Sequence, residues 1–274
     1  WVFSLFYKRL LTLLASQKLK SDYRLGELGA RGSLSALLRK EGRKFLGTPV
    51  LTLNGGFGVL LAVVGGIAAL FFKETIAGFL AEAMNMGVGE LLTTYLTPGL
   101  LAAAAFLCSM TYISCVSISL EGKTLWILKE APLGTGRIFA AKAGFNLLLS
   151  GTGLVVCVLL LWPAFSLPVL DVVCMLVLGL LFTTLCSTLG LFVNLLLPRM
   201  DAENDTMVVK NSASVIVTML VEFVLLALFV VLFILVRGLG FGVYTLISGA
   251  ILLALNAGVL LLLNTTGRKL FAQL

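Results

Sequence analysis

The sequence contains blocks of about 20 or more apolar residues, separated by shorter polar segments. In an α-helix, which rises about 1.5 Å per residue, such a block is long enough to cross the ~30 Å hydrocarbon core of a bilayer. The blocks lack the alternation of apolar and polar residues that marks a membrane-spanning β-strand. Composition agrees with this reading, since 59% of the residues are hydrophobic and only 12% are charged. We therefore predict an all-α, polytopic membrane protein.

The apolar blocks predict six transmembrane helices, at residues 53–72, 91–120, 143–165, 168–196, 215–236 and 242–263. Of the 20 Lys and Arg residues, 18 lie before the first span, in the loops 121–142 and 197–214, or in the C-terminal tail. These four segments share one side of a six-span chain, and an excess of Lys and Arg marks the cytoplasmic side. We therefore expect both ends of the chain to be cytoplasmic. The net charge of +7 then reflects this bias, and we expect no nucleic-acid partner.

The first residues, WVFSLFYKRLLTLL, read as the end of an apolar span that runs into basic residues. A signal peptide would place its charges before the apolar core. We interpret residues 1–32 as the end of a preceding span and a cytoplasmic linker, which makes 33–274 a six-span domain within a longer polypeptide. A short interfacial anchor is the alternative for the first 14 residues.

Residues 33–46 form a predicted amphipathic helix that lies in the membrane interface. Its apolar arc contains Leu34, Leu37, Leu38 and Phe45, and its basic residues suit an anionic inner leaflet. The charged residues of this helix are Arg39, Lys40, Glu41, Arg43 and Lys44. Glu41 projects onto the apolar arc. It either pairs with Lys44 or Lys40 on the same helix, or anchors the helix to a neighbouring cytoplasmic loop.

The loop 121–142 begins with Gly122-Lys123-Thr124, which matches the end of a nucleotide-binding P-loop. The first glycine of that motif is missing, because Ser117 occupies its place, and a predicted membrane helix stands where a strand should precede it. We therefore expect no ATP site and no cofactor in this chain. The next residues predict a short helix stopped by Pro132, whose apolar side chains must be buried against lipid headgroups or in a groove of another protein.

Three stretches, ALLRKEGRKFLGTPVLTLNGGFG, EGKTLWILKEAPLG and LPRMDAENDTMVVKNSAS, resemble the permease subunit of bacterial ABC transporters of the type-two exporter class. The similarity is closest to a group of Gram-positive exporters whose permeases are about twice this length, with this pattern in the later half. It covers most of residues 33–214. It implies a permease in a bacterial plasma membrane, without its own ATPase site, that works with a separate ABC ATPase subunit and a second permease half or copy.

In that family, the helix between the second and third spans is a coupling helix that contacts the ATPase. Matched residue by residue, the resemblance places the ATPase contact at Glu121, Lys123, Leu125, Trp126, Ile127, Leu128 and Lys129. One departure concerns the link between the fifth and sixth spans. Members of the class often have re-entrant helices there, whereas this chain has only residues 237–241, and the external segment 73–90 is the candidate substitute.

Charged and amide side chains inside a membrane are costly and call for a partner or a purpose. Glu222 of the fifth span and Asn256 of the sixth fall at similar predicted depths, so we expect a hydrogen bond between them. The alternative function is a secondary transporter or channel-like protein in which Glu222 is a working intramembrane carboxylate. The five cysteines lie in apolar blocks without metal-ligand spacing, and there is no histidine, so we expect no metal site and no enzyme activity.

Overall fold

The computed structural model describes residues 32–202 and 204–274. Within these residues all regular structure is helical, and no strand is present. Five helices are long and apolar enough to cross a membrane, and a bent pair of shorter helices brings the number to as many as six. The predicted all-α, polytopic fold is therefore confirmed. The prediction of a preceding span falls on residues 1–31, outside the described part of the chain.

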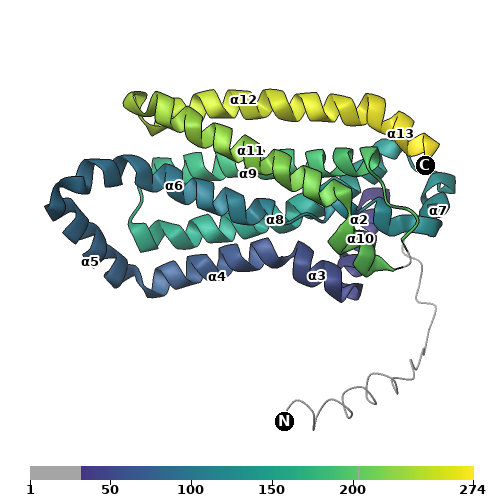
Figure 1. Cartoon of the computed structure of the whole chain (residues 1–274), viewed down its shortest axis with the longest axis horizontal. Coiled ribbons are helices and arrows are strands. Elements are labelled where there is room, and N and C mark those ends of the chain that lie inside the picture. Colours follow the sequence, from purple (N-terminus) through teal and green to yellow (C-terminus); the bar gives the residue numbers. More distant parts are fainter. Residues whose placement is uncertain (1–31, 203) are drawn as a thin grey trace, which may run out of the picture. The chain divides into compact units, whose positions relative to one another are not determined.

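The crossing helices run side by side, with short helices gathered at the two ends of the bundle (Figure 1). The long elements are α4 (Phe57–Phe71), α6 (Gly89–Ser109), α8 (Thr135–Phe165), α9 (Val169–Leu196), α11 (Ala213–Val236) and α12 (Phe241–Leu262). At one end, here the α7 end, lie α2 (Ser33–Gly47), α7 (Leu125–Glu130), α10 (Asp205–Asn211) and α13 (Arg268–Gln273). The opposite, α5 end carries α5 (Lys73–Ala83).

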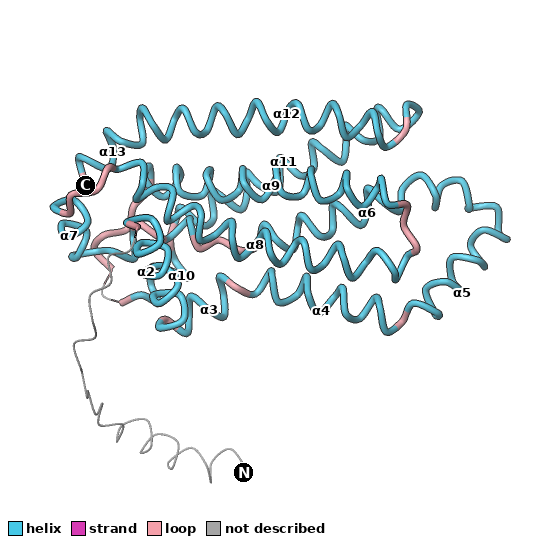
Figure 2. The backbone as a smooth tube through the Cα atoms, turned by 180° about the vertical axis from the view of Figure 1, so that it is seen from behind, coloured by secondary structure: helices cyan, strands magenta, loops and turns pink. Residues whose placement is uncertain are grey.

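Helices α8 and α9 form the centre of the bundle. They pack against each other, and α8 also packs on α4, while α9 packs on α6, α11 and α12 (Figure 2). Buried residues of these two helices include Leu154, Met175 and Leu191, each with no measurable exposure. Burial of large apolar side chains contributes roughly 1.5–3 kcal/mol each in water, but within a membrane, close packing between helices replaces that driving force.

The first predicted span, 53–72, corresponds to a bent pair of helices. Helix α3 (Pro49–Gly55) begins four residues before the predicted span, at the proline that follows α2, and meets α4 at an angle of 49°. Close backbone packing on α6 accompanies the bend. A Cβ atom on Gly58 would lie 2.1 Å from the carbonyl oxygen of Leu107, so only glycine fits there.

The second predicted span, 91–120, is shorter than expected, because α6 ends at Ser109. The chain then forms 3₁₀ turns at Ser114–Val116 and Ser119–Thr124. The continuous helix predicted to residue 120 is therefore wrong. The residues after α6 are apolar for a different reason: the segment from Ile113 to Glu121 is buried inside the protein. Irregular backbone is tolerated in a membrane protein where protein surrounds it.

The other spans agree more closely with the prediction. Helices α9, α11 and α12 begin and end within about two residues of the predicted boundaries. Helix α8 begins at Thr135 instead of residue 143, so its first two turns belong to the loop that we assigned to residues 121–142. The link between α11 and α12 is a single 3₁₀ turn, Arg237–Leu239.

Candidate functional site

Helix α7 is the short helix predicted between the second and third spans, and it lies at the end of the bundle beside α2 and α13. Its two leucines, Leu125 and Leu128, are 4% and 7% exposed and belong to the main hydrophobic core. Trp126 and Ile127 project from the other side and are 62% and 53% exposed. The helix is therefore anchored by one apolar pair and presents a second one.

The ends of α7 are fixed by the rest of the chain. Before it, Gly122 has a φ of 49°, a left-handed value that glycine adopts without steric cost. After it, the Lys129 ammonium donates a hydrogen bond to the Ala272 carbonyl oxygen at 3.1 Å and lies 5.9 Å from the centre of the Phe271 ring. Lys129 thus joins α7 to α13, while Lys123 is exposed.

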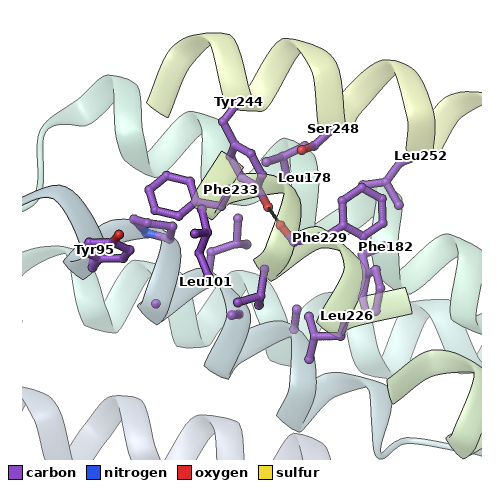
Figure 3. Close-up of a pocket in the computed structure, with 17 residues that line it drawn as sticks. Tyr95, Leu101, Leu178, Phe182, Leu226, Phe229, Phe233, Tyr244, Ser248 and Leu252 are labelled. Atoms are coloured by element: carbon purple, nitrogen blue, oxygen red, sulfur yellow. Dashed lines mark hydrogen bonds between the residues drawn. The ribbon is translucent and has the colours of Figure 1, made fainter. Parts of the chain in front are cut away.

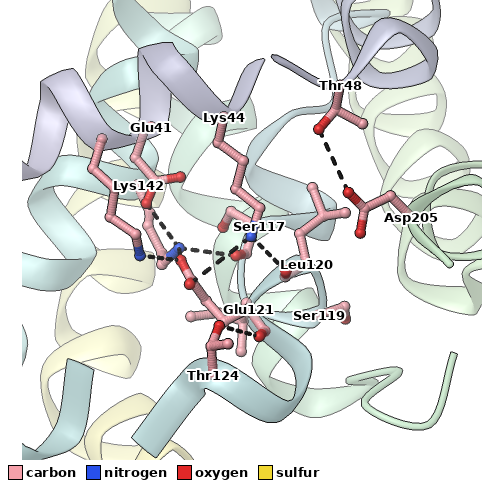
Figure 4. A network of polar contacts seen from close by, with 12 residues as sticks. Glu41, Lys44, Thr48, Ser117, Ser119, Leu120, Glu121, Thr124, Lys142 and Asp205 are labelled. Atoms are coloured by element: carbon pink, nitrogen blue, oxygen red, sulfur yellow. Dashed lines mark hydrogen bonds and ion pairs between the residues drawn. The ribbon is translucent and has the colours of Figure 1, made fainter. Parts of the chain in front are cut away.

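Glu121 was expected at the edge of a partner contact, but its side chain is buried. Its side chain is 3% exposed, and it lies in a network of buried ion pairs (Figure 4). The Lys142 ammonium is 2.6 Å from Glu121 Oε1 and also donates to the Ser117 carbonyl oxygen at 2.8 Å. Lys40 reaches Glu121 Oε1 at 2.7 Å. A third lysine, Lys44, has its ammonium 3.9 Å from Glu121 Oε2. Glu121 is therefore a buried residue that is surrounded by three lysines.

Glu41 lies on the buried stripe of α2, between Leu37 and Phe45, as its position on the apolar arc predicted. Its ion-pair partner is Lys142 of α8, at 2.9 Å. The expected pair with Lys40 or Lys44 is wrong for the described residues, because both lysines turn toward the Glu121 segment instead. Glu41 therefore joins α2 to the start of α8, which is the anchoring alternative.

The remaining face of α2 is basic. Arg39 and Arg43 are exposed, whereas Lys40 and Lys44 are partly buried. The apolar stripe packs on α8, where a Cβ atom on Gly42 would touch the Phe145 ring at 3.4 Å. Leu37 and Phe45 are thus covered by protein, and Leu34 and Leu46 are the large apolar side chains of α2 that are exposed.

Burial and the neighbouring charges shift the pKa values of Glu121 and Lys44. Burial alone would raise the pKa of the Glu121 carboxyl, but Lys142 and Lys44, together with the hydrogen bonds from Lys142 and Lys40, outweigh that effect and lower the pKa to about 2. For Lys44, burial lowers the pKa, and the attraction of Glu121 opposes it only in part. Glu121 is therefore ionised at every physiological pH.

Two asparagines satisfy the irregular backbone that follows α6. Asn146 Oδ1 of α8 accepts hydrogen bonds from the N–H groups of Ile113, at 2.9 Å, and Ser114, at 3.4 Å. Asn194 Oδ1 of α9 accepts from Ile118, at 2.8 Å, and Ser119, at 3.2 Å. Both asparagines are at most 2% exposed. Each side chain replaces two backbone hydrogen bonds that the interrupted helix lacks.

Asn146, Asn194 and Lys142 were not among the site residues predicted from the sequence. The sequence nevertheless contained an indication that each of these three side chains needs a partner. Both asparagines fall inside predicted spans, where an amide side chain calls for a partner. Lys142 directly precedes a predicted span, within one helical turn of the apolar block.

The predicted hydrogen bond between Glu222 and Asn256 is absent from the described residues. Asn256 Nδ2 donates to the Leu181 carbonyl oxygen of α9 at 3.1 Å and to Leu252 of its own helix at 2.8 Å. Glu222 is 4% exposed and contacts the thiol of Cys186. The prediction failed because it assumed that α11 and α12 turn these residues toward each other, whereas α9 provides the contacts of both.

Comparison with known proteins gives no family assignment. No family model matches the chain, and neither a curated protein sequence nor a solved structure matches it significantly.

A polar cleft of about 320 Å³ lies next to α7. It is formed by the turn that contains Glu121 and Lys123 and by the segment between α9 and α10, and its charged lining includes Arg199, Asp201 and Asp205. Arg199 donates to the Asn211 carbonyl oxygen, which fixes one wall. The α7 end thus combines an exposed apolar pair with an adjoining cleft that carries both charge signs.

Proposed function

We propose that this chain is the membrane-spanning subunit of an ATP-driven exporter. In this proposal a separate ABC ATPase subunit binds α7 and hydrolyses ATP, and the chain works with a second permease half or copy. The chain is placed in a bacterial plasma membrane, with the α7 end and both chain ends facing the cytoplasm. The Lys and Arg distribution supports this orientation, since Arg237 and Lys73 alone among these residues lie in segments of the other side.

The observation that carries the proposal is the pair of exposed apolar residues on α7. Trp126 and Ile127 protrude from a helix whose other face is anchored in the core. Buried aromatic anchors supply much of the affinity of protein interfaces. The adjoining polar cleft supplies charged groups of the kind found at an interface rim.

The contacts of α7 also support a mechanical role. The turn before α7 is tied to α2 and α8 by the ion pairs of Glu121 and Lys142. Its end is tied to α13 by Lys129. Breaking a buried ion pair is costly, because it leaves a buried charge without its partner. A partner that displaces α7 would therefore move α2, α8 and α13 with it.

The proposal is tested by purifying the tagged chain from the membranes of its native cell. We expect a stoichiometric protein with an ABC ATPase domain, and ATP hydrolysis by the purified complex. Trp126→Ala combined with Ile127→Ala is expected to remove this partner and the ATPase activity. Leu125 and Leu128 are left unchanged, because their replacement would disturb the core.

The matched control is Phe79→Ala combined with Met86→Ala. These residues are 67% and 70% exposed and lie at the opposite end of the bundle. The control is expected to keep both partner and activity. A purified chain that transports its cargo without any ATPase, or a complex that survives the double α7 variant, would contradict the proposal.

One observation favours the alternative of a secondary transporter. Glu222 borders a groove of about 290 Å³ between α6 and α11, whose other lining residues include Phe106 and Met219. Intramembrane carboxylates with access to a cavity occur in proton relays. If Glu222 works in this way, Glu222→Gln abolishes transport while expression of the chain and its insertion into the membrane stay intact. Unchanged transport in that variant excludes the alternative.

A further inference from the structure

An apolar pocket within the bundle is separate from the α7 site. It has a volume of about 220 Å³ and lies between α6, α9, α11 and α12, with lining that runs from Tyr95 to Ala105 on α6 and from Tyr244 to Leu252 on α12. Eight to ten helical residues correspond to a length of roughly 12–15 Å along the bundle. The pocket is therefore a slot parallel to the helices.

The two ends of the slot differ in chemistry. Figure 3 shows Tyr95, Phe233 and Tyr244 together at one end, and Phe182, Leu226 and Leu252 at the other. The aromatic rings pack edge to face, at 5.6 Å between Tyr95 and Phe233 and 5.2 Å between Phe233 and Tyr244. The tyrosine end is amphipathic and the far end is apolar throughout.

A cation stands at the tyrosine end. Arg237, in the turn after α11, donates a hydrogen bond to the Tyr95 hydroxyl, and its guanidinium lies 6.0 Å from the ring centre. Among the side chains that the structure describes, which do not include that of Glu90, no carboxylate forms an ion pair with Arg237. Asp171 of α9 accepts a hydrogen bond from the Thr97 hydroxyl of α6 at 2.9 Å. Arg237 is exposed, and a guanidinium has five N–H donors, of which one binds the Tyr95 hydroxyl.

The slot also has a side facing out of the bundle. Val230 and Ile234 of α11 line it and are 41% and 48% exposed. Phe229, Phe233 and Tyr244 form the inner wall and are at most 8% exposed. A chain from the surrounding bilayer can therefore enter laterally, without passing through the core.

We propose that this slot binds one alkyl chain of an anionic membrane lipid, with the charged headgroup held by Arg237. The apolar far end fits the chain, the tyrosines fit the boundary between chain and headgroup, and the exposed guanidinium fits the anion. This inference does not rest on the proposed function.

The test uses palmitic acid that carries a photoreactive diazirine, with the purified chain in phosphatidylcholine nanodiscs. After illumination, mass spectrometry locates the adducts. We expect them on the lining segments 95–105 and 226–234, and competition by unlabelled palmitate but much less by hexadecanol, which has the same chain without the charge.

Two variants with matched controls distinguish lipid binding in the slot from lipid contact elsewhere on the protein surface. A Cβ atom at Gly99, on the lining, meets no atom within 4 Å, so Gly99→Phe places a ring in the slot. We expect it to remove the slot adducts. Gly258→Phe, at an equally open position outside the slot, is expected to keep them. Arg237→Gln should weaken palmitate competition about fivefold, since one cation near a lipid surface contributes about 1 kcal/mol; Lys73→Gln, a cation on α5, should not.

Adducts spread evenly over the lipid-facing helices of the unmodified chain would overturn the proposal, whatever the variants do. So would equal competition by palmitate and hexadecanol, which would remove the role of Arg237. If a second copy of the chain fills the slot, protein crosslinks replace lipid adducts there, and the proposal is equally overturned.

Discussion

The Lys142 ammonium of α8 donates to Glu41 Oε1 of α2 at 2.9 Å, although 101 positions separate the two residues in the chain. Both side chains are almost completely buried, and the same ammonium also binds Glu121. One cation therefore fixes the places of two carboxylates from two other segments. Through them it joins α2, α8 and the turn that leads into α7.

Replacement of Lys142 by methionine tests this connection. The variant leaves Glu41 without its described ion-pair partner in a buried site, and loss of one member of a buried ion pair costs about 3–5 kcal/mol. We expect a lower midpoint of thermal unfolding, followed by tryptophan fluorescence in nanodiscs. Lys210→Met, at an exposed lysine of α10, is the control and should leave the midpoint unchanged. Equal effects of both variants would contradict the connection.

The second prediction concerns pH. The pKa of Glu121 is lowered in the folded chain to about 2, below its ordinary value of 4.5, so its ionisation contributes stability that is fully present above pH 4.5. That contribution is lost as the pH falls toward 2. We expect the unfolding midpoint of the unmodified chain to exceed that of Glu121→Gln at pH 7, and the difference to shrink between pH 4.5 and pH 2. A difference that does not vary with pH would contradict the assigned ion pairs.

The sequence predicted the long helices because apolar blocks of this length have few other structures available in a bilayer. The end of the short helix was predicted because a local signal existed, since Pro132 follows shortly after α7 ends at Glu130. The end of α6 was missed because hydropathy measures burial and not helicity. Residues 110–120 are as apolar as a span, yet protein surrounds them in place of lipid.

In the candidate site, too, features set by local sequence were predicted, whereas features set by distant contacts were not. The short helix with Trp126 was predicted from its apolar residues and the proline that follows. Which faces of it are free depends on how α7 meets α8 and α13, and no pattern within six residues contains that information. Likewise, the rule that a buried charge needs a partner applied correctly to Glu41, but the partner is on α8, distant in sequence.

The third prediction concerns Asn194. Its replacement by alanine removes the acceptor of the Ile118 and Ser119 amides, and each buried group left unsatisfied costs about 1–3 kcal/mol. We expect these two amides to exchange with deuterium faster in Asn194→Ala, while amides in the middle of α12 stay protected. Asn264→Ala is the control, since the described contacts of Asn264 are with its own helix and Arg268. Unchanged exchange at residues 118 and 119 would show that another group holds the irregular segment.

The last prediction concerns the close approach of α9 to that segment at Gly190. A Cβ atom there would lie 2.6 Å from Cys115 Sγ and 2.7 Å from Ser114 Oγ, so alanine must displace these two buried side chains of the 3₁₀ turn. Overpacking of this kind costs about 1–3 kcal/mol, which exceeds the gain of up to about 1 kcal/mol that alanine brings to a helix. We expect Gly190→Ala to lower the unfolding midpoint, and Gly258→Ala, at an open position of α12, to hold or raise it. If both substitutions raise the midpoint, α9 does not pack against the irregular segment as closely as the structure has it.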